Sequence, residues 1–401
     1  MRTWQLVELA LLLVPGFLVL WRVRLLAPGG RGGSAGARRP AARVRGSDKE
    51  AFSVIIPARD EEERLPLLLR SLEVQTVRPR EIIVVNDGSR DRTARVARDA
   101  GCRVVAAGRR PRGWLGKTWA CWVGARRARA GLLLFLDADT SLEPSACERL
   151  LRELAAREGV VTVQPWHRPG SAVETLSSLF NVVVMAAINS FTVLQERLPA
   201  AGCFGPCILC RREDYFLAGG HRGVRGSILE DLDLGQRFLA AGVPVHCLGG
   251  KGSVQFRMYP GGRGMIEGWT KNMARGAQGT HPAVLVLTAL WITGCASAAA
   301  LAAWWAASGP LPASIEALGF YLGYAAQLHW MLRRVGRFGA HSALLFPVHL
   351  AFFAGVFARS LVLTFVVRRV SWRGRRISDP RRSGSRSAPN TRKHEPRRAK
   401  L

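Results

Sequence analysis

Short apolar runs alternate with helix-like stretches between residues 51 and 260. Four runs of strand length are bounded by turn formers or charges: FSVIIP (52–57), EIIVV (81–85), CRVVAA (102–107) and LLLFL (132–136). Strands that alternate with helices form βαβ units, which build a parallel sheet covered on both faces. We therefore predict an α/β domain with a mainly parallel sheet, and place it at 51–275.

Another apolar stretch precedes this region. Residues 4–21 are just long enough to span a bilayer, although Glu8 and Pro15 weaken the pattern. Nearly all of the nearby arginines follow this stretch, whereas a signal peptide carries its positive charge before the apolar core. The pattern favours an uncleaved transmembrane anchor at 1–24, followed by a Gly-, Ala- and Arg-rich linker at 25–50.

Three more apolar stretches predict C-terminal membrane helices within 281–367. They cover residues 283–307, 313–332 and 342–367. Three simple spans would put the basic tail outside the cell, yet its charge favours the cytoplasmic side. We therefore expect the last stretch to be a re-entrant or interfacial hairpin. The tail at 368–401, rich in Arg, Ser and Pro, is predicted to be disordered.

The stretch 171–196 is apolar with few charges and allows two interpretations. It forms either a helix that lies along the membrane surface or a buried core helix. The pattern alone does not decide between them.

The charge of the chain bears on its partners. The formal net charge is +29 although 48% of the residues are hydrophobic, a mixture typical of a membrane protein with basic cytoplasmic flanks. Nucleic-acid binding is the competing interpretation, but the arginines cluster beside apolar segments and in the tail, without a zinc-finger, RNP or basic-zipper pattern. We expect a multi-pass protein of the cell membrane, with its globular domain in the cytoplasm and no nucleic-acid partner.

The eight cysteines do not suggest a metal site or a disulfide framework. Cys203, Cys207 and Cys210 are closely spaced, but a fourth zinc ligand at suitable spacing is missing. Most of the others lie in apolar surroundings and are expected to pack as small hydrophobic residues.

Acidic residues follow three of the predicted strands. Asp60 and Glu61 come after the first, Asp87 after the second, and Asp137 and Asp139 after the fourth. Ligands of such sheets bind at the carboxyl ends of the strands. Carboxylates there would accept hydrogen bonds from a base or ribose, and an Asp-x-Asp pair suits a hard divalent cation such as Mg²⁺.

The ordered motifs resemble a known family. FSVIIPARDEEERL, IIVVNDGSRDRT, FLDADT and a GG followed by LEDLDLGQRF are similar, in that order, to the membrane-bound family 2 glycosyltransferases, which have a GT-A fold. The resemblance covers roughly residues 51–275. GWLGKTWACWVGA (113–125) and RMY…EGWTKN (257–272) are similar to the branch with the carotenoid (diaponeurosporenoate-type) and hopanoid-associated enzymes. The resemblance implies a GT-A Rossmann-like mixed, mainly parallel sheet flanked by transmembrane helices.

The resemblance and the strand ends together give the expected donor site. The cofactor would be Mg²⁺ or Mn²⁺ with Asp139 as its ligand, and the donor a nucleotide sugar, with a UDP-sugar as the family habit. The expected donor-binding residues are Pro57, Ala58, Asp60, Glu61, Asp87, Lys117 and Asp137. Simpler roles remain open: a capping box between Asp60 and Glu63, a turn at Asp87, and a solvated Lys117.

The family places its general base at the second acid of a Glu-Asp pair, which is Asp231 here. An acid in the first turn of a helix is also an ordinary dipole partner. Residues expected near the acceptor or the diphosphate are Gly220, His221, Glu230, Arg257, Trp269 and Lys271. Processive relatives carry Q-x-x-R-W, but the spacing here is Q-x-R-x-Y, at Gln255, Arg257 and Tyr259, which speaks against polymer synthesis.

We therefore expect a metal-dependent inverting glycosyltransferase. It would move a sugar to a lipid acceptor of carotenoid, hopanoid or polyprenyl type at the cytoplasmic face of the bilayer. The alternatives are a polysaccharide synthase of the same family and a non-catalytic membrane scaffold; a scaffold would be expected to have lost Asp87, Asp139 or Asp231.

Overall fold

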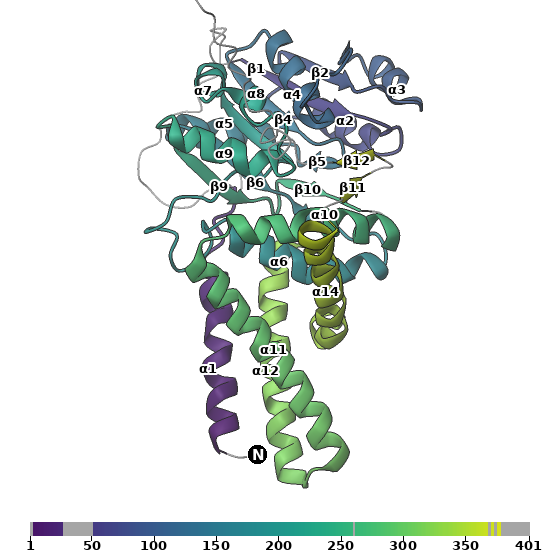
Figure 1. The fold of residues 1–401 in the computed structure, drawn as a ribbon. Coiled ribbons are helices and arrows are strands. Elements are labelled where there is room, and N and C mark those ends of the chain that lie inside the picture. The colour runs from purple at the N-terminus through teal and green to yellow at the C-terminus, as the bar shows by residue number, and fades with distance from the viewer. Residues whose placement is uncertain (1–2, 27–50, 260, 368–369, 373–374, 378–401) are drawn as a thin grey trace, which may run out of the picture.

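The computed structural model describes residues 3–26, 51–259, 261–367, 370–372 and 375–377. Figure 1 shows a sheet-containing part at one end of the molecule, from which α1, α11 and α12 project as long helices. Helix α10 lies between the two parts.

A seven-stranded mixed sheet is the centre of the fold, in the order β3-β2-β1-β4-β8-β6-β9. Strand β8 is antiparallel to both of its neighbours, and the other four pairings are parallel, in agreement with the mainly parallel sheet that the sequence predicted. The chain moves outward from β1 to β2 and β3 and then returns to β4 on the other side of β1, which opens a crevice at their carboxyl ends. The strands are β1 Phe52–Ala58, β2 Glu81–Asn86, β3 Arg103–Ala106, β4 Leu132–Leu136, β6 Val160–Gln164, β8 Cys207–Arg211 and β9 Val245–Gly249.

Each face of this sheet is buried in its own core. Alternate residues of β1 point to opposite faces, so Val54 and Ile56 pack in one core and Ile55 in the other. The covering helices are α2 Leu65–Glu73, α3 Thr93–Asp99, α4 Gly116–Arg127, α5 Ala146–Ala156, α7 Arg212–Leu217, α8 Gly220–Gly223 and α9 Glu230–Ala240. Because both faces are covered, the sheet offers its strand ends for ligand binding.

A second sheet of three short strands lies beside the crevice. Strand β10 (Val254–Phe256) pairs antiparallel with β5 (Thr140–Leu142) and parallel with β7 (Trp166–His167). His167 also forms an isolated bridge with Gly336, where the amide of Arg337 donates to the His167 carbonyl at 2.7 Å. This bridge ties the chain that leaves the projecting helices to the sheet part.

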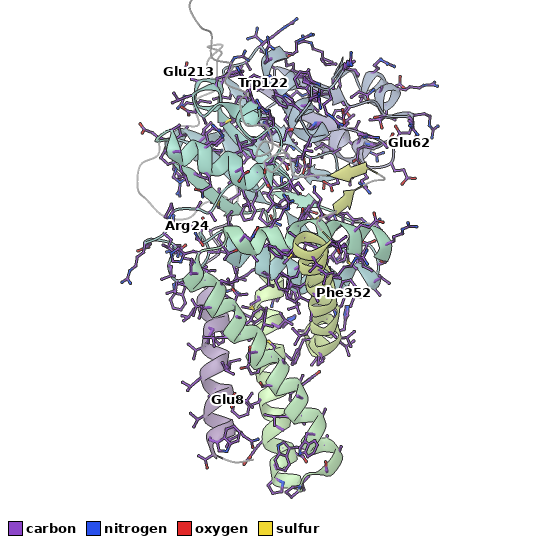
Figure 2. The ribbon with its side chains drawn as sticks, viewed as in Figure 1. Glu8, Arg24, Glu62, Trp122, Glu213 and Phe352 are labelled. Atoms are coloured by element: carbon purple, nitrogen blue, oxygen red, sulfur yellow. The ribbon has the colours of Figure 1, made fainter. Side chains whose placement is uncertain are left out.

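The remaining helices share a third core. They are α1 Thr3–Val19, the 3-10 helix η1 Val173–Ser177, α6 Ser178–Ala187, α10 Gly262–Gly279, α11 Pro282–Ser308, α12 Leu311–Val335, α13 Ala340–Leu344, and α14 Phe346–Leu361, which continues as a π-helix, η2 Val362–Val366. Within the described chain, two segments are long and apolar enough to cross a membrane, Pro282–Ser308 and Phe346–Val366. The expected middle span, 313–332, lies within the helix α12 but is not one of these two segments. Its Gln327 is buried and accepts a hydrogen bond from Trp291 of α11. Many apolar side chains stand outward from the projecting helices (Figure 2).

The stretch 171–196 is a core element. Most of α6 is buried, and Phe180 stacks on Trp269 of α10 with ring centroids 4.9 Å apart. The buried-helix interpretation therefore agrees with the structure.

Two segments outside the expected domain also have defined backbone. The amide of Leu26 donates to the Gly249 carbonyl at 3.1 Å, so the start of the expected linker pairs with β9. The rest of that linker, 27–50, lies outside the described residues. In the tail that we predicted to be disordered, Val370–Trp372 (β11) and Arg375–Ile377 (β12) pair as a two-stranded antiparallel sheet, consistent with the β-propensity of Val, Trp and Ile. Residues 378–401 lie outside the described residues.

Candidate active site

A cleft of about 460 Å³ lies at the carboxyl ends of β1, β2 and β4. The N-terminal ends of α4 and α9 and one face of α10 complete its wall. Ten of the fifteen residues proposed from sequence line it: Pro57, Ala58, Glu61, Asp87, Lys117, Asp137, Asp139, Glu230, Asp231 and Lys271. The acids that the chain carries far apart therefore meet in one place.

Lys117 lies at the centre of the charged groups. Its Nζ is 2.9 Å from Oδ1 of Asp137 and 3.2 Å from Oε1 of Glu230. Burial alone would lower the pKa of Lys117, but Asp137, Glu230 and Asp231 raise it well above the usual value. Lys117 is thus a charged bridge between two walls of the cleft and not a solvated surface residue.

Helix α4 brings Lys117 to this position through a close approach at Gly116. A Cβ at Gly116 would collide with the carboxylate of Asp87. The amide of Asp87 donates to the Ala58 carbonyl at 3.0 Å, which fixes the end of β2 beside that of β1. Asp87 therefore stands at the cleft wall with its carboxylate packed on the first turn of α4.

Asp137 and Asp139 lie on a turn that begins where β4 ends. The amide of Thr140 donates to the Asp137 carbonyl at 3.1 Å, and Ala138 is buried. Since the chain turns at this point, the two aspartates do not alternate across the sheet, and both line the cleft.

This donor set fits a divalent cation. Burial and the charges of Asp137 and Glu61 raise the pKa of Asp139 to about 7, and a bound cation would offset the repulsion between these carboxylates. No group of three or more His, Cys, Asp or Glu side chains suited to a metal occurs in the described part of the chain. Two carboxylates leave positions open for phosphate oxygens, the arrangement Mg²⁺ and Mn²⁺ commonly have with nucleotides.

Asp231 is oriented by the backbone. Its Oδ2 accepts a hydrogen bond from the amide of Gly205 at 3.1 Å, and its Oδ1 accepts one from the amide of Leu232 at 3.0 Å. Burial and neighbouring Glu230 raise the pKa of Asp231 to about 6. Glu230 itself is buried, yet Lys117 and Lys271 hold its pKa below the usual value. The two acids thus differ in pKa, as expected for a base and a permanently charged neighbour.

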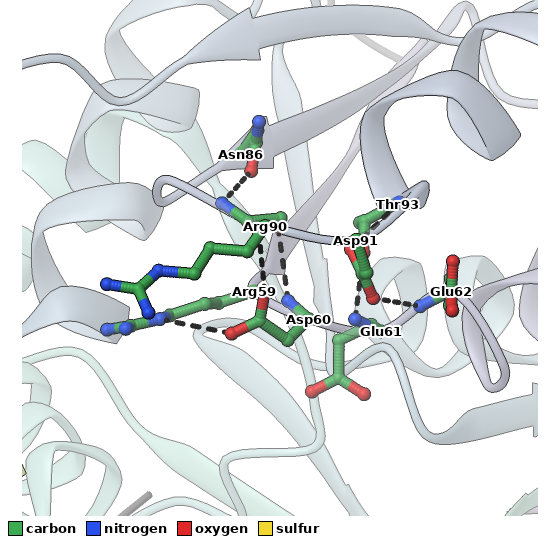
Figure 3. Close-up of polar contacts among 9 residues, drawn as sticks. Arg59, Asp60, Glu61, Glu62, Asn86, Arg90, Asp91 and Thr93 are labelled. Atoms are coloured by element: carbon green, nitrogen blue, oxygen red, sulfur yellow. Dashed lines mark hydrogen bonds and ion pairs between the residues drawn. The ribbon is translucent and has the colours of Figure 1, made fainter. Parts of the chain in front are cut away.

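Asp60 does not line the cleft, and its carboxylate points toward Arg59 and Arg90 (Figure 3). Its backbone has a φ of 53°, and its Oδ1 accepts from the amide of Arg90 at 2.8 Å. Its own amide donates to Oγ of Ser89 at 3.1 Å. The alternative capping box with Glu63 is wrong, because α2 begins at Leu65 with Arg64 as its N-cap. Asp60 instead joins the loops after β1 and β2.

Four of the expected acceptor-side residues also lie outside the cleft. Gly220 packs against the ring of Tyr215, and buried His221 binds the Tyr215 hydroxyl through Nδ1 at 2.9 Å. Trp269 is in the helical core. Arg257 forms two hydrogen bonds with the buried carboxylate of Glu174, at 2.6 and 3.0 Å.

Sequence reasoning missed part of the wall. Arg110 lines the cleft from the loop after β3, and Glu267 and Asn272 line it from α10. Extending the strand-end argument to the third predicted strand would have found Arg110. Glu267 lies four residues before Lys271 on the same helix face, so helical periodicity would have indicated it. Asn272 is about 100° around the axis from Lys271, and periodicity would not have indicated it.

All eight cysteines are buried with free thiols. Cys203, Cys207 and Cys210 contribute to the cores around β8. Burial raises the pKa of each of these thiols, so they are neutral at physiological pH.

A mixed sheet with an acidic cleft at its strand ends is the arrangement of a GT-A glycosyltransferase, and sequence comparison agrees. The model of the family "Glycosyl transferase family 2" matches residues 53–216. The 4,4'-diaponeurosporenoate glycosyltransferase of Staphylococcus aureus (strain USA300) is 36% identical over 335 residues, which cover 82% of this chain and 88% of that protein. The chain belongs to the family 2 glycosyltransferases and is a glycosyltransferase.

Two further comparisons agree with this assignment. The enzyme of the same name from Staphylococcus haemolyticus (strain JCSC1435) is 40% identical over 256 residues, covering 62% of this chain and 68% of that protein. The mannosyltransferase PcManGT from Pyrobaculum calidifontis, solved with GDP-Man and Mn²⁺, superposes with a TM-score of 0.51 at 16% identity, over 89% of this chain and 98% of that one. The latter likeness confirms the GT-A fold.

Proposed function

We propose that the protein transfers a sugar, with inversion, from a nucleotide sugar to a lipid at the membrane surface. One observation carries this proposal: Asp137, Asp139, Lys117 and Asp231 meet in a cleft whose far wall is α10. The opposite side of α10 packs on α6 and α14, among the apolar helices. The donor site and the apolar helical core are thus separated by one helix.

The donor half of the cleft has the groups that a nucleoside diphosphate requires. Glu61 and Asp87 would accept hydrogen bonds from the base and ribose. Asp139, with Asp137 beside it, would hold Mg²⁺ or Mn²⁺, which when bound stabilises the charge of the diphosphate leaving group. The Mn²⁺ and GDP-Man bound by PcManGT support this choice of ligand class.

The acceptor step needs one bond formed and one broken. An acceptor oxygen attacks the anomeric carbon from the side opposite the diphosphate, and the bond to the diphosphate breaks with its electron pair on the leaving oxygen. A hydroxyl acceptor gives its proton to Asp231. A carboxylate acceptor has no proton to give, so Asp231 would then act by position and charge only.

We favour a carotenoid-type carboxylate or hydroxyl as the acceptor. The names of the curated relatives specify 4,4'-diaponeurosporenoate, an apolar chain with a carboxylate end. Lys271, in the cleft wall on α10, offers a cation near Asp231 for such a group. Gln255 and Arg257 stand where processive relatives carry Q-x-x-R-W, but here they bind Glu143 and Glu174, respectively, and do not line the cleft. This supports a single transfer over polymer synthesis.

The membrane part of the proposal rests on the apolar helices. Besides the two spans, α1 exposes Trp4, Val7 and Leu11, and α12 exposes Leu311 and Ile315. We place the cleft on the cytoplasmic side, where arginines follow α1 and α12.

The test is to incubate membranes that contain the protein with a panel of labelled nucleotide sugars, and to extract and identify the labelled lipid. Label in one lipid class, absent for Asp139→Ala, is expected. Label in a long polymer would refute single transfer, and equal label for Asp139→Ala would refute the metal ligand.

A further inference from the structure

A second hollow, of about 680 Å³, lies beside the catalytic cleft, and we refer to it as the basic groove. Asp139 lies between the two cavities and lines both. The side chains that give the basic groove its character are Arg168, Arg257, Arg337 and His341. The function proposed above uses none of its space.

Backbone hydrogen bonds fix the three arginines around the small sheet. The amide of Arg168 donates to the Phe256 carbonyl at 2.9 Å, and that of Arg257 to the Asp139 carbonyl at 3.3 Å. Arg337 is held by the bridge to His167. The cations therefore come from three segments far apart in sequence, and their backbones are placed before any ligand binds.

The charges of the basic groove are only partly compensated. Arg257 is paired with Glu174, whereas Arg168 is hydrogen-bonded to the neutral Gln255 at 2.9 Å. Within the described residues, neither Arg168 nor Arg337 forms an ion pair with a carboxylate. Two guanidinium groups with nearby Ser and Thr hydroxyls form the donor set typical of phosphate recognition.

The position of the basic groove indicates where that phosphate comes from. His341 lies on the short helix α13, and exposed apolar side chains begin directly after it at Leu344, Leu345 and Val348, which are 47, 55 and 57% exposed. Leu344 and Leu345 directly precede the apolar segment Phe346–Val366, and Val348 lies in its first turn. In a membrane protein, the boundary between polar and apolar surface lies at the depth of the lipid headgroups. Cationic side chains at that boundary therefore lie near the headgroup phosphates.

We propose that the basic groove binds the phosphate headgroup of an anionic membrane phospholipid. This inference rests on the membrane association proposed above but not on the sugar transfer. The lipid would lie against the loop that contains Arg257, whose amide holds the backbone of Asp139, and so next to the metal end of the catalytic cleft.

Native mass spectrometry of the full chain in detergent tests this without any activity measurement. The purified protein is incubated with phosphatidylglycerol, with zwitterionic phosphatidylcholine, or with inorganic phosphate. Wild type should retain phosphatidylglycerol in preference to phosphatidylcholine. Arg168→Gln and Arg337→Gln should each weaken that retention roughly five-fold, and Lys at either position should restore most of it.

Arg333→Gln is the matched control, because Arg333 is exposed near the same end of α12 but does not line the basic groove. An equal loss in this variant would mean general attraction to the surface and would overturn the site, as would unchanged retention in both groove variants. Displacement of phosphatidylglycerol by an equal concentration of inorganic phosphate would overturn the lipid assignment. Unchanged thermal unfolding confirms that each variant is folded.

Discussion

The carboxylate of Asp231 is held by the backbone amide of Gly205, with 3.1 Å between the amide nitrogen and Oδ2. Gly205 lies just before β8, whereas Asp231 lies in the first turn of α9. A Cβ at Gly205 would approach that oxygen to 2.8 Å, so the close contact requires a glycine. The orientation of the proposed base is thus set by two segments and not by its own rotamer alone.

Asp231→Asn removes the proton acceptor and retains the size of the side chain. With a hydroxyl acceptor, we expect transfer to slow by roughly 10²- to 10⁴-fold with donor binding retained, because general-base catalysis contributes about that much. With a carboxylate acceptor the loss should be much smaller. Single-turnover transfer to matched alcohol and acid acceptors measures the difference. Asp233→Asn, on the same helix but outside the cleft, is the control; equal loss there would contradict the assignment.

Asp139→Ala should abolish Mn²⁺-supported transfer and weaken Mn²⁺ binding, because the cation loses its main protein ligand. Titration of Mn²⁺ by electron paramagnetic resonance, with nucleotide present, measures the binding. Asp60→Asn should leave Mn²⁺ affinity near that of wild type, since its carboxylate faces the Arg90 amide. Unchanged Mn²⁺ affinity for Asp139→Ala would assign the metal elsewhere.

Lys117→Met removes the cation between Asp137 and Glu230. Lys117 lowers the pKa of both Asp231 and Glu230, so these pKa values rise in the variant. A base must be deprotonated to act, and transfer to a hydroxyl acceptor in wild type should therefore rise with pH through about 6. The rise should move to higher pH in the variant. A rate profile at saturating metal measures it, and an unshifted profile would contradict the coupling.

Glu174→Gln should destabilise the protein by about 1–3 kcal/mol, because Arg257 loses a buried charged partner. Hydrogen bonds from Arg257 and from the amide of Gly170 outweigh burial and lower the pKa of Glu174 to about 2. The folded-state pKa lies below the unfolded one, near 4.5, so this stability is present above pH 4.5 and is lost as pH falls toward 2. Thermal unfolding between pH 7 and 3 measures the difference. Glu62→Gln, in an exposed pair with Arg92, should change little.

The strands before the cleft could be predicted because turn formers and charges bound each apolar run. The last of the four runs coincides with β4, Leu132–Leu136. The antiparallel β8 was not predicted, because its residues, CILCR, read as a short apolar run without a partner. Pairing between strands distant in the chain does not follow from local pattern.

Some site residues were placed correctly by the sequence prediction, and others were not. Asp137 and Asp139 were predicted to lie at a strand end, and the turn there directs both into the cleft. Asp60 was predicted by the same rule, but its left-handed backbone directs the carboxylate to Arg90. Trp269 and Lys271 are two residues apart on one helix, about 200° around its axis, so one meets the core when the other meets the cleft.

Backbone hydrogen bonds join each sheet to a chain segment that follows an apolar helix. The large sheet is joined to the segment after α1, at Leu26 beside Gly249, and the small sheet to the segment after α12, at Arg337 beside His167. A catalytic unit held at two points cannot swing freely relative to these helices. In the membrane arrangement proposed above, its cleft would therefore stay at one height above the lipids. Such an enzyme would select acceptors by depth as well as by chemistry, because only a group that emerges at that height meets Asp231.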